Sequence, residues 1–126
     1  MKKIIQTNDA PQPIGPYSQA ILINNMLYTS GQIALEPDSG KLILDTITLE
    51  TEQVMKNLQA VLASANMTFE HVIKSTIYII NMDDFGAINE VYGTFFKESS
   101  APARETVQVA KLPKNVNIEI SVIASK

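Results

Sequence analysis

The sequence predicts a two-layer α+β fold, in which two helices pack on one face of a mixed β-sheet. Three observations support this fold class. Short runs rich in β-branched residues occur toward both ends of the chain, two segments repeat apolar residues at helical spacing, and the segments follow the order strands, helix, strand, helix, strands. The length of 126 residues indicates one domain, residues 1–126, with a single core.

The N-terminal part is predicted to contain a loop and two strands. Prolines exclude a helix from Ala10–Pro16 and favour a loop. Ala20–Asn24 and Met26–Ser30 are predicted strands, joined at a pair of asparagines that tolerate positive φ. Gly31 is expected to end the second of these strands.

Two helices follow from the spacing of apolar residues. The first is predicted from about Thr46 to Ala65, with Asn66 as a left-handed stop. The second follows N-cap candidates within Asn81–Asp84. Its predicted buried face consists of four residues spaced three, four and three apart: Phe85, Ile88, Tyr92 and Phe95.

Three further strands are predicted: Val72–Ile80 between the helices, then Arg104–Val109 and Ile118–Val122 near the C-terminus. Side chains alternate between the faces of a strand. This alternation predicts that valines and isoleucines of the last two strands face the core. The polar side chains would then share the other face, together with Ile123; they are Arg104, Thr106, Gln108, Glu119 and Ser121. A semi-polar face of this kind suits a subunit interface better than bulk water.

The composition excludes several classes of function. The net charge is −3 and no basic block is present, which argues against nucleic acid as a direct ligand. Without cysteine there are no disulfides, thiolate nucleophiles or thiolate metal sites. Polar residues follow Met1–Ile5 directly, and no apolar run reaches membrane-spanning length. We therefore expect a cytoplasmic protein that is neither secreted nor inserted in a membrane.

Arg104 and Glu119 are the candidate functional charges. A guanidinium binds a carboxylate through two parallel hydrogen bonds, but a salt bridge to a neighbour such as Glu105 is an equally good interpretation of the residues alone. A carboxylate such as Glu119 can transfer protons. Its alternative is an ordinary charge on the outer face of a strand.

Six short motifs occur in order along the chain: Ala10-Pro11, Ile14–Gln19, Thr29–Gln32, Pro102–Arg104, Val109–Pro113 and Ile118–Ile120. With these motifs the chain resembles the reactive intermediate deaminase family (RidA, also called YjgF) over nearly its whole length. The resemblance implies a chorismate-mutase-like fold and a homotrimer with a ligand cleft at each subunit boundary.

The activity that the resemblance implies is that of a 2-iminobutanoate/2-iminopropanoate deaminase. Such an enzyme hydrolyses reactive 2-imino acids, or their enamine tautomers, to 2-keto acids and ammonia, and uses neither cofactor nor metal. The imines leak from pyridoxal-phosphate dehydratases that act on serine or threonine, so the role would be control of metabolite damage.

The resemblance also assigns roles to single residues. Arg104 would bind the substrate carboxylate, and Glu119 would orient or activate water. Tyr17 would contact the ligand and is the second catalytic candidate, although it could serve only to anchor its loop. Ser30 and Gly31 would present backbone N–H groups; the alternative for Gly31 is a simple turn glycine.

Asn89 and Thr106 complete the expected binding residues. Asn89 matches a family asparagine near the cleft, with a solvent-facing side chain as its alternative. Thr106 stands where many members have cysteine, and a role through backbone hydrogen bonds would survive this change. Glu105 stands where a small residue is usual, and alternation directs it away from Arg104. His71, the only histidine, is expected to be solvated or bonded locally.

Two other functions compete with the deaminase. The same cleft could bind keto acids or amino acids in a regulatory, non-enzymatic trimer, or the trimer could act as a holdase. A carboxylate receptor needs the arginine but not a glutamate that handles water. The pair of Arg104 and Glu119 therefore favours the enzyme.

Overall fold

The computed structural model describes all 126 residues. Its strands are β1 (Lys3–Ile5), β2 (Ala20–Ile23), β3 (Met26–Thr29), β4 (Val72–Ile79), β5 (Ala103–Gln108) and β6 (Ile118–Ser125). Its α-helices are α1 (Ile47–Ser64) and α2 (Phe85–Gly93). Every helix and strand that the sequence predicted is present, and only the three-residue edge strand β1 was missed.

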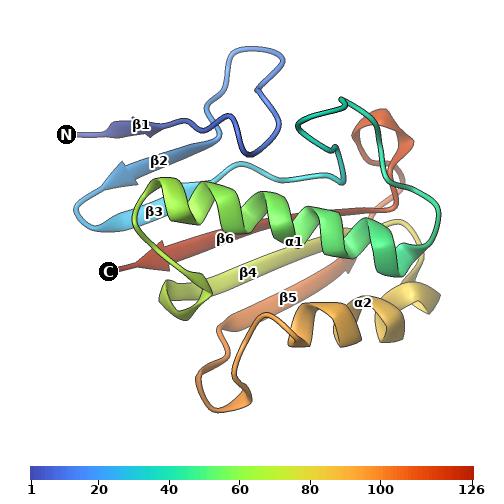
Figure 1. The fold of residues 1–126 in the computed structure, drawn as a ribbon. Coiled ribbons are helices and arrows are strands. Elements are labelled where there is room, and N and C mark those ends of the chain that lie inside the picture. Colours follow the sequence, from blue (N-terminus) through green and yellow to red (C-terminus); the bar gives the residue numbers. More distant parts are fainter.

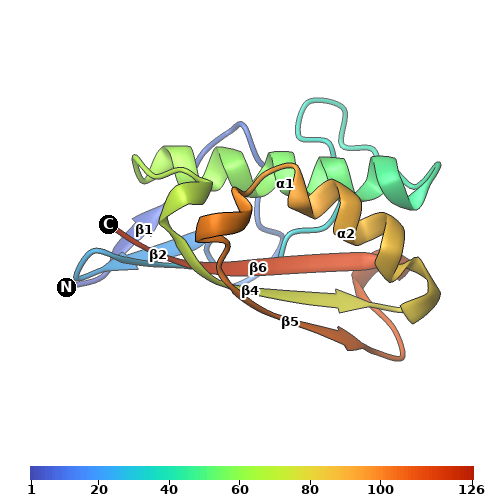
Figure 2. The same ribbon diagram turned by 90° about the horizontal axis from the view of Figure 1, so that it is seen from below.

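The six strands form one sheet in the order β1-β2-β3-β6-β4-β5, in which only β4 and β5 run parallel. Both helices lie on the same side of this sheet (Figure 2). In Figure 1, α1 lies across the middle strands and α2 lies beside β5. The predicted two-layer α+β fold is thus confirmed. No helix is both long and apolar enough to span a bilayer.

Local signals define α1. The side chain of Thr46 caps the helix by accepting a hydrogen bond from the backbone N–H of Leu49. Beyond the last turn, Asn66 adopts the left-handed conformation with a φ of 57°. Between these ends the helix buries a continuous apolar stripe against the sheet, formed by Val54, Met55, Leu58, Val61 and Leu62.

The second helix is shorter than its apolar spacing suggested. It ends at Gly93, so Phe95 lies in the following turn and is half-buried. Ile88 and Tyr92 are buried as predicted, whereas Phe85 is only partly buried. An arginine from β5, Arg104, lies over the ring of Phe85.

The predicted orientation of β5 was wrong. Arg104, Thr106 and Gln108 pair with Ser75, Ile77 and Ile79 of β4, which are fully buried beneath the helices. Cross-strand partners project to the same face of a sheet. The polar side chains of β5 therefore lie on the helix-covered face, and Val107, 43% exposed, lies on the open one. Alternation was predicted correctly, but β5 is an edge strand whose helix-covered side has room for polar groups.

The orientation of β6 was predicted correctly. Its isoleucines and Val122 are buried, and Glu119 and Ser121 lie on the open face of the sheet. That face also carries Tyr28, which is 45% exposed, and an ion pair of 3.3 Å between Lys74 and Glu105. It is a mixed apolar and polar surface that no part of the same chain covers.

Candidate functional site

A cavity of about 560 Å³ lies where the Pro11–Gln19 loop, the segment after β3 and the start of β6 meet. Four of the predicted site residues line it: Tyr17, Ser30, Gly31 and Glu119. The other lining residues are Pro11, Gln12, Ile14, Gln19, Gln32, Ile33, Leu35, Pro113 and Lys114. The cavity thus gathers four of the seven residues that the sequence selected.

Glu119 is the acidic group of this cavity. It belongs to the regular ladder of β6, paired with Tyr78 of β4, so its backbone position is fixed by the sheet. Its side chain is partly buried and makes no ion pair and no hydrogen bond within the chain. Loss of solvation on burial raises the pKa of the Glu119 carboxyl above its ordinary value. A carboxyl group that holds its proton more tightly than a free glutamate is better suited to act as a proton donor.

Gly31 forms the wall against which Glu119 packs. A Cβ atom on residue 31 would lie 2.7 Å from Cδ and 2.9 Å from Cγ of Glu119, which is closer than real side chains approach. The neighbouring residue Gln32 forms a backbone bridge to Ile120, with N–H···O distances of 2.8 and 3.1 Å. The Glu119 side chain can therefore take this position only while residue 31 is glycine.

Tyr17 and Ser30 join the N-terminal loop to the cavity. The Tyr17 side chain is 52% exposed, and its hydroxyl accepts a long hydrogen bond of 3.4 Å from the backbone N–H of Ile14. The Ser30 hydroxyl donates to the carbonyl of Ser18 at 2.6 Å. Ser30 therefore holds the loop in place, whereas the phenol of Tyr17 remains accessible from the cavity.

Two of the nine lining residues that the sequence did not select have distinctive local structure. The buried Gln19 donates through Nε2 to the carbonyls of Thr7, Ala10 and Pro11 and accepts from the N–H of Thr7, which shapes the loop. Lys114 adopts a left-handed backbone conformation with a φ of 56°. Positive φ is uncommon for residues other than glycine and asparagine, so no sequence signal marked Lys114.

Arg104 is held by α2 on the other side of the sheet. Its guanidinium carbon lies 5.3 Å from the ring centre of Phe85 and 5.0 Å from that of Tyr92. Its Nη1 donates to Oδ1 of Asn89 at 2.6 Å. Asn89 is exposed, as its predicted alternative had it, and also contacts Arg104. The predicted alternative of a salt bridge between Arg104 and Glu105 does not occur, since Glu105 pairs with Lys74. The contacts orient the guanidinium and leave part of its fork free.

The floor beneath Arg104 is built by a buried hydrogen bond. The Tyr92 hydroxyl donates to Oγ of Ser75 at 2.9 Å, and burial raises the pKa of Tyr92. Two residues along the strand from Arg104, Thr106 has a hydroxyl oxygen that is buried and has no hydrogen-bond partner. Unsatisfied buried groups are rare, and this one lies on the same side of β5 as Arg104.

One chain does not bring Arg104 and Glu119 together. The two residues lie on opposite faces of the sheet, and β4 separates their strands. Their β4 partners, Ser75 and Tyr78, are three residues apart, which places the two Cα atoms about 10 Å apart along the strands and about 10 Å across them. Thr106 and Asn89 belong with Arg104, and Tyr17, Ser30 and Gly31 belong with Glu119. The predicted site is therefore divided into two halves within the chain.

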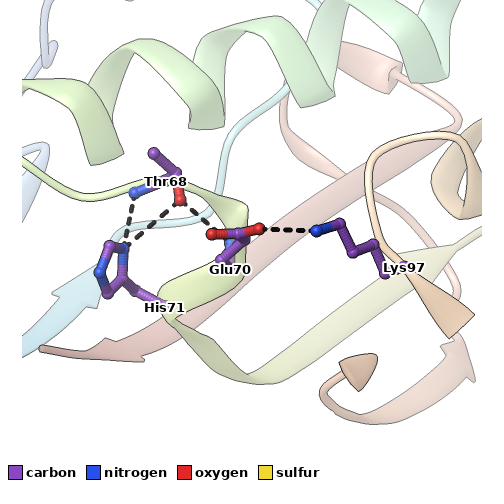
Figure 3. Close-up of polar contacts among 4 residues, drawn as sticks. All are labelled: Thr68, Glu70, His71 and Lys97. Atoms are coloured by element: carbon purple, nitrogen blue, oxygen red, sulfur yellow. Dashed lines mark hydrogen bonds and ion pairs between the residues drawn. The ribbon is translucent and has the colours of Figure 1, made fainter. Parts of the chain in front are cut away.

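His71 belongs to neither half. Its Nδ1 accepts a hydrogen bond of 2.9 Å from the backbone N–H of Thr68, and beside it Glu70 pairs with Lys97 at 3.2 Å (Figure 3). The expectation of a locally bonded histidine is confirmed. No cluster of three or more histidine, aspartate or glutamate side chains in the chain has the arrangement of a metal site.

Comparison with known proteins places these residues in a family. The family model for endoribonuclease L-PSP matches residues 7–126. A proposed regulator, AldR, of Lactococcus lactis is 52% identical over 97% of this chain and 96% of its own length. The 2-iminobutanoate/2-iminopropanoate deaminase of Mus musculus is 44% identical over 98% of this chain and 91% of its own.

A solved structure gives the same result for the fold. The structure of E. coli TdcF with bound serine superimposes with a TM-score of 0.93. The two sequences are 40% identical, and the match covers 98% of each chain. At this level of identity the two proteins share an ancestor as well as a fold.

Proposed function

This chain belongs to the endoribonuclease L-PSP family, whose members include imine deaminases of the RidA type, and we propose that it hydrolyses 2-imino acids and their enamine tautomers to 2-keto acids and ammonia. The observation that carries the proposal is Glu119, a partly desolvated carboxyl group with no partner in the chain, fixed in a strand over the glycine wall of an open cavity.

The chemistry fits one carboxyl group with a raised pKa. Protonated Glu119 gives its proton to the imine nitrogen, or to the β-carbon of the enamine tautomer, and thereby makes C2 electrophilic. The carboxylate formed then takes a proton from the water that attacks C2. Glu119 passes this proton on to the amino group of the resulting carbinolamine. Ammonia then leaves as the C2–N bond breaks, the C2 hydroxyl returns its proton to Glu119, and the 2-keto acid remains. This hydrolysis needs no oxidant and no reductant. We assign a share in the proton transfers to Tyr17, which lines the same cavity as Glu119.

We place the substrate carboxylate on Arg104 of a second subunit. Arg104 and Glu119 lie on opposite faces of one sheet, so a site that uses both needs two copies of the chain. The open face, with Tyr28 and Val107 exposed, supports burial against another copy. A cyclic trimer would build three equivalent sites in this way, and we expect it to act in the cytoplasm.

The test is complementation between two inactive variants. Arg104→Ala and Glu119→Gln each destroy every site in their own homotrimers. Co-refolded at equal amounts they mix at random, and roughly a quarter of the interfaces then carry both intact residues if each site takes them from different subunits. We expect about that fraction of the wild-type rate of imine turnover. Activity no greater than that of the separate variants, in trimers proven to be mixed, would contradict the shared site.

A second candidate function is regulation by ligand binding. It is favoured by the relationship to a proposed regulator and by the serine bound to TdcF. In this case the chain would bind amino acids or keto acids through Arg104 without turnover. Ammonia release from imines generated in situ by an amino-acid oxidase separates the two functions, since a receptor leaves the spontaneous rate of imine hydrolysis unchanged.

The family description itself names RNA cleavage. We do not extend that activity to this chain. Its net charge is −3, and Lys114 is the one basic side chain that lines the cavity, beside Glu119. Binding to an RNA backbone requires several cations along one surface.

A further inference from the structure

Glu50 is a buried carboxylate without a cation. It lies in the first turn of α1, is 0% exposed and makes no ion pair. Its Oε2 accepts hydrogen bonds from the backbone N–H groups of Asn117 at 2.8 Å and Ile118 at 3.2 Å, and its Oε1 accepts from Nδ2 of Asn117 at 2.7 Å. These three donors replace the water that the carboxylate loses on burial. Two of them belong to Asn117, the residue before β6, and the third belongs to Ile118, the first residue of β6.

Asn57 makes a matching set of contacts on the same helix. It follows Glu50 by seven residues, or two turns, and is 1% exposed. Its Nδ2 donates to the carbonyls of Ile33 at 3.0 Å and Leu35 at 2.9 Å. Its Oδ1 accepts from Gln53 of the same helix at 2.9 Å. The two carbonyls belong to the segment directly after Gly31 and Gln32.

These two residues therefore hold opposite walls of the cavity. Glu50 holds the residues immediately before Glu119, and Asn57 holds the segment that continues from Gly31. Both are attached to one helix, in which two turns span about 10 Å along a stiff axis. The backbone bridge between Gln32 and Ile120 is the direct link between the walls. The helix adds a second, indirect link on the far side of the sheet from the cavity.

We propose that Glu50 and Asn57 are positioning residues that set the contact between Gly31 and Glu119 and so fix where the Glu119 carboxyl group stands. Apolar side chains of similar size would fill the same space. They would not specify which backbone groups of β6 and of the Ile33–Leu35 segment meet the helix, whereas directional hydrogen bonds do. The specification matters because a slip of β6 by one residue would turn Glu119 into the core. The proposal rests on the function proposed above for Glu119.

Four variants and one control test the pair. Glu50→Gln keeps the length and one acceptor for the two backbone N–H groups, and the Asn117 amide can rotate to pair with the new amide. Glu50→Asp keeps the charge but shortens the side chain, so it cannot reach all three donors. Asn57→Ala removes both bonds to the other wall, and Asn117→Ala removes only one side-chain bond. The control is Val61→Ala, which leaves a cavity in the core beneath α1 without contact to either wall.

We expect these variants to differ from one another in kcat, whereas KM should change by less than about twofold in each. Glu50→Asp and Asn57→Ala should lose roughly tenfold to hundredfold in kcat, the size of effect that a small misplacement of a catalytic group produces. Glu50→Gln should stay near wild type, Asn117→Ala should fall between, and Val61→Ala should lower the melting temperature without lowering kcat. If Glu50→Asp does not fold, the comparison of Asn57→Ala and Asn117→Ala with Val61→Ala remains.

A readout without substrate tests the pair even if the protein proves not to be a deaminase. In protein labelled with ¹³C at glutamate carboxyl groups, the Glu119 signal is the one missing from Glu119→Gln. We expect its titration midpoint to move toward that of free glutamate in Glu50→Asp and Asn57→Ala, and to stay in Glu50→Gln and Val61→Ala. Unchanged midpoint and unchanged kcat in both Glu50→Asp and Asn57→Ala, or equal changes in Val61→Ala, would overturn the proposal. Absent turnover in the wild type, with the midpoints moving as expected, would contradict the deaminase alone.

Discussion

The Glu119 side chain lies against the backbone of Gly31 so closely that no Cβ atom fits between them. Because residue 31 has no side chain, the carboxyl group of Glu119, the candidate proton donor, has room to occupy this position. The contact also links two motifs that are 88 positions apart in the sequence, one at the end of β3 and one at the start of β6.

The first prediction follows from this contact. In Gly31→Ala the new methyl group displaces the flexible Glu119 side chain and leaves the backbone in place. Turnover should fall about 10²-fold, and the free energy of unfolding should change by less than about 1 kcal/mol. Imine turnover and chemical denaturation check these values. The control is Gly86→Ala, where nothing lies within 4 Å of the new Cβ in an exposed part of α2; it should keep full activity. A Gly31→Ala enzyme as active as Gly86→Ala would contradict the role of the contact.

The second prediction separates catalysis from binding at Glu119. The amide of Glu119→Gln keeps the shape but cannot transfer the proton, so turnover should fall ~10²–10⁴-fold. Binding of an unreactive 2-keto acid through Arg104 should persist. Kinetics and calorimetry on the same preparation measure both. If turnover is kept, the proton is handled elsewhere, with Tyr17 next. If both are lost, Glu119 holds the cavity together.

The third prediction uses the pH dependence of stability. The pKa of Glu119 is raised by burial, so folding favours its protonated form. This contribution to stability is full below the pKa of the unfolded chain and is lost as the pH rises through the raised pKa of the folded state. Glu119→Gln has no such loss. The difference in melting temperature, variant minus wild type, should therefore increase from pH 4 to pH 7. A difference that is constant with pH would show that burial does not raise the pKa of this carboxyl group.

The fourth prediction concerns the shape of Arg104. Lysine keeps the charge but loses the fork and the flat contacts with Phe85 and Tyr92. Arg104→Lys should therefore be nearly as inactive as Arg104→Ala. An unpaired carboxylate in a partly desolvated cleft typically costs about 2–5 kcal/mol of binding free energy. Keto-acid calorimetry measures the loss. Lys97→Ala, which removes an exposed ion pair with Glu70, serves as the control and should bind normally.

The fifth prediction is that turnover survives chelation. The chain has no cysteine, and its one histidine caps a turn at Thr68. A closed transition-metal site normally needs several such ligands. Activity after treatment with EDTA and dialysis should match that of untreated protein. Loss of activity that a divalent metal restores would show that the reaction needs an ion.

The sequence was sufficient for the fold because its signals are local. The left-handed pair Asn24-Asn25 and the stop at Asn66 act within a few residues, and both were predicted and confirmed. The cap at Thr46, which was predicted only as the approximate start of the helix, is equally local. The site was harder to predict, because its halves depend on which face of β5 turns toward the helices. Alternation defines two faces but does not say which is inside for an edge strand.

Glu50 and Asn57 illustrate the same limit. In the sequence, both are polar residues on a long helix, and nothing marks them as buried. Their partners are 67 and 22–24 residues away, at backbone groups of β6 and the Ile33–Leu35 segment. A pattern of side chains carries no information on which backbone N–H or carbonyl groups a fold leaves unpaired, so these contacts could be found only from the structure.

The place of β6 has a consequence for the biosynthesis of the protein. This strand leaves the ribosome after the other five, yet it lies in the middle of the sheet between β3 and β4. Until it emerges, the nascent chain holds two separate half-sheets with open edges and lacks Glu119. The sheet is therefore expected to close only after β6 has emerged, at the slow rate typical of pairings between distant segments. A chain terminated early at position 117 should give neither a stable nor a partly active product.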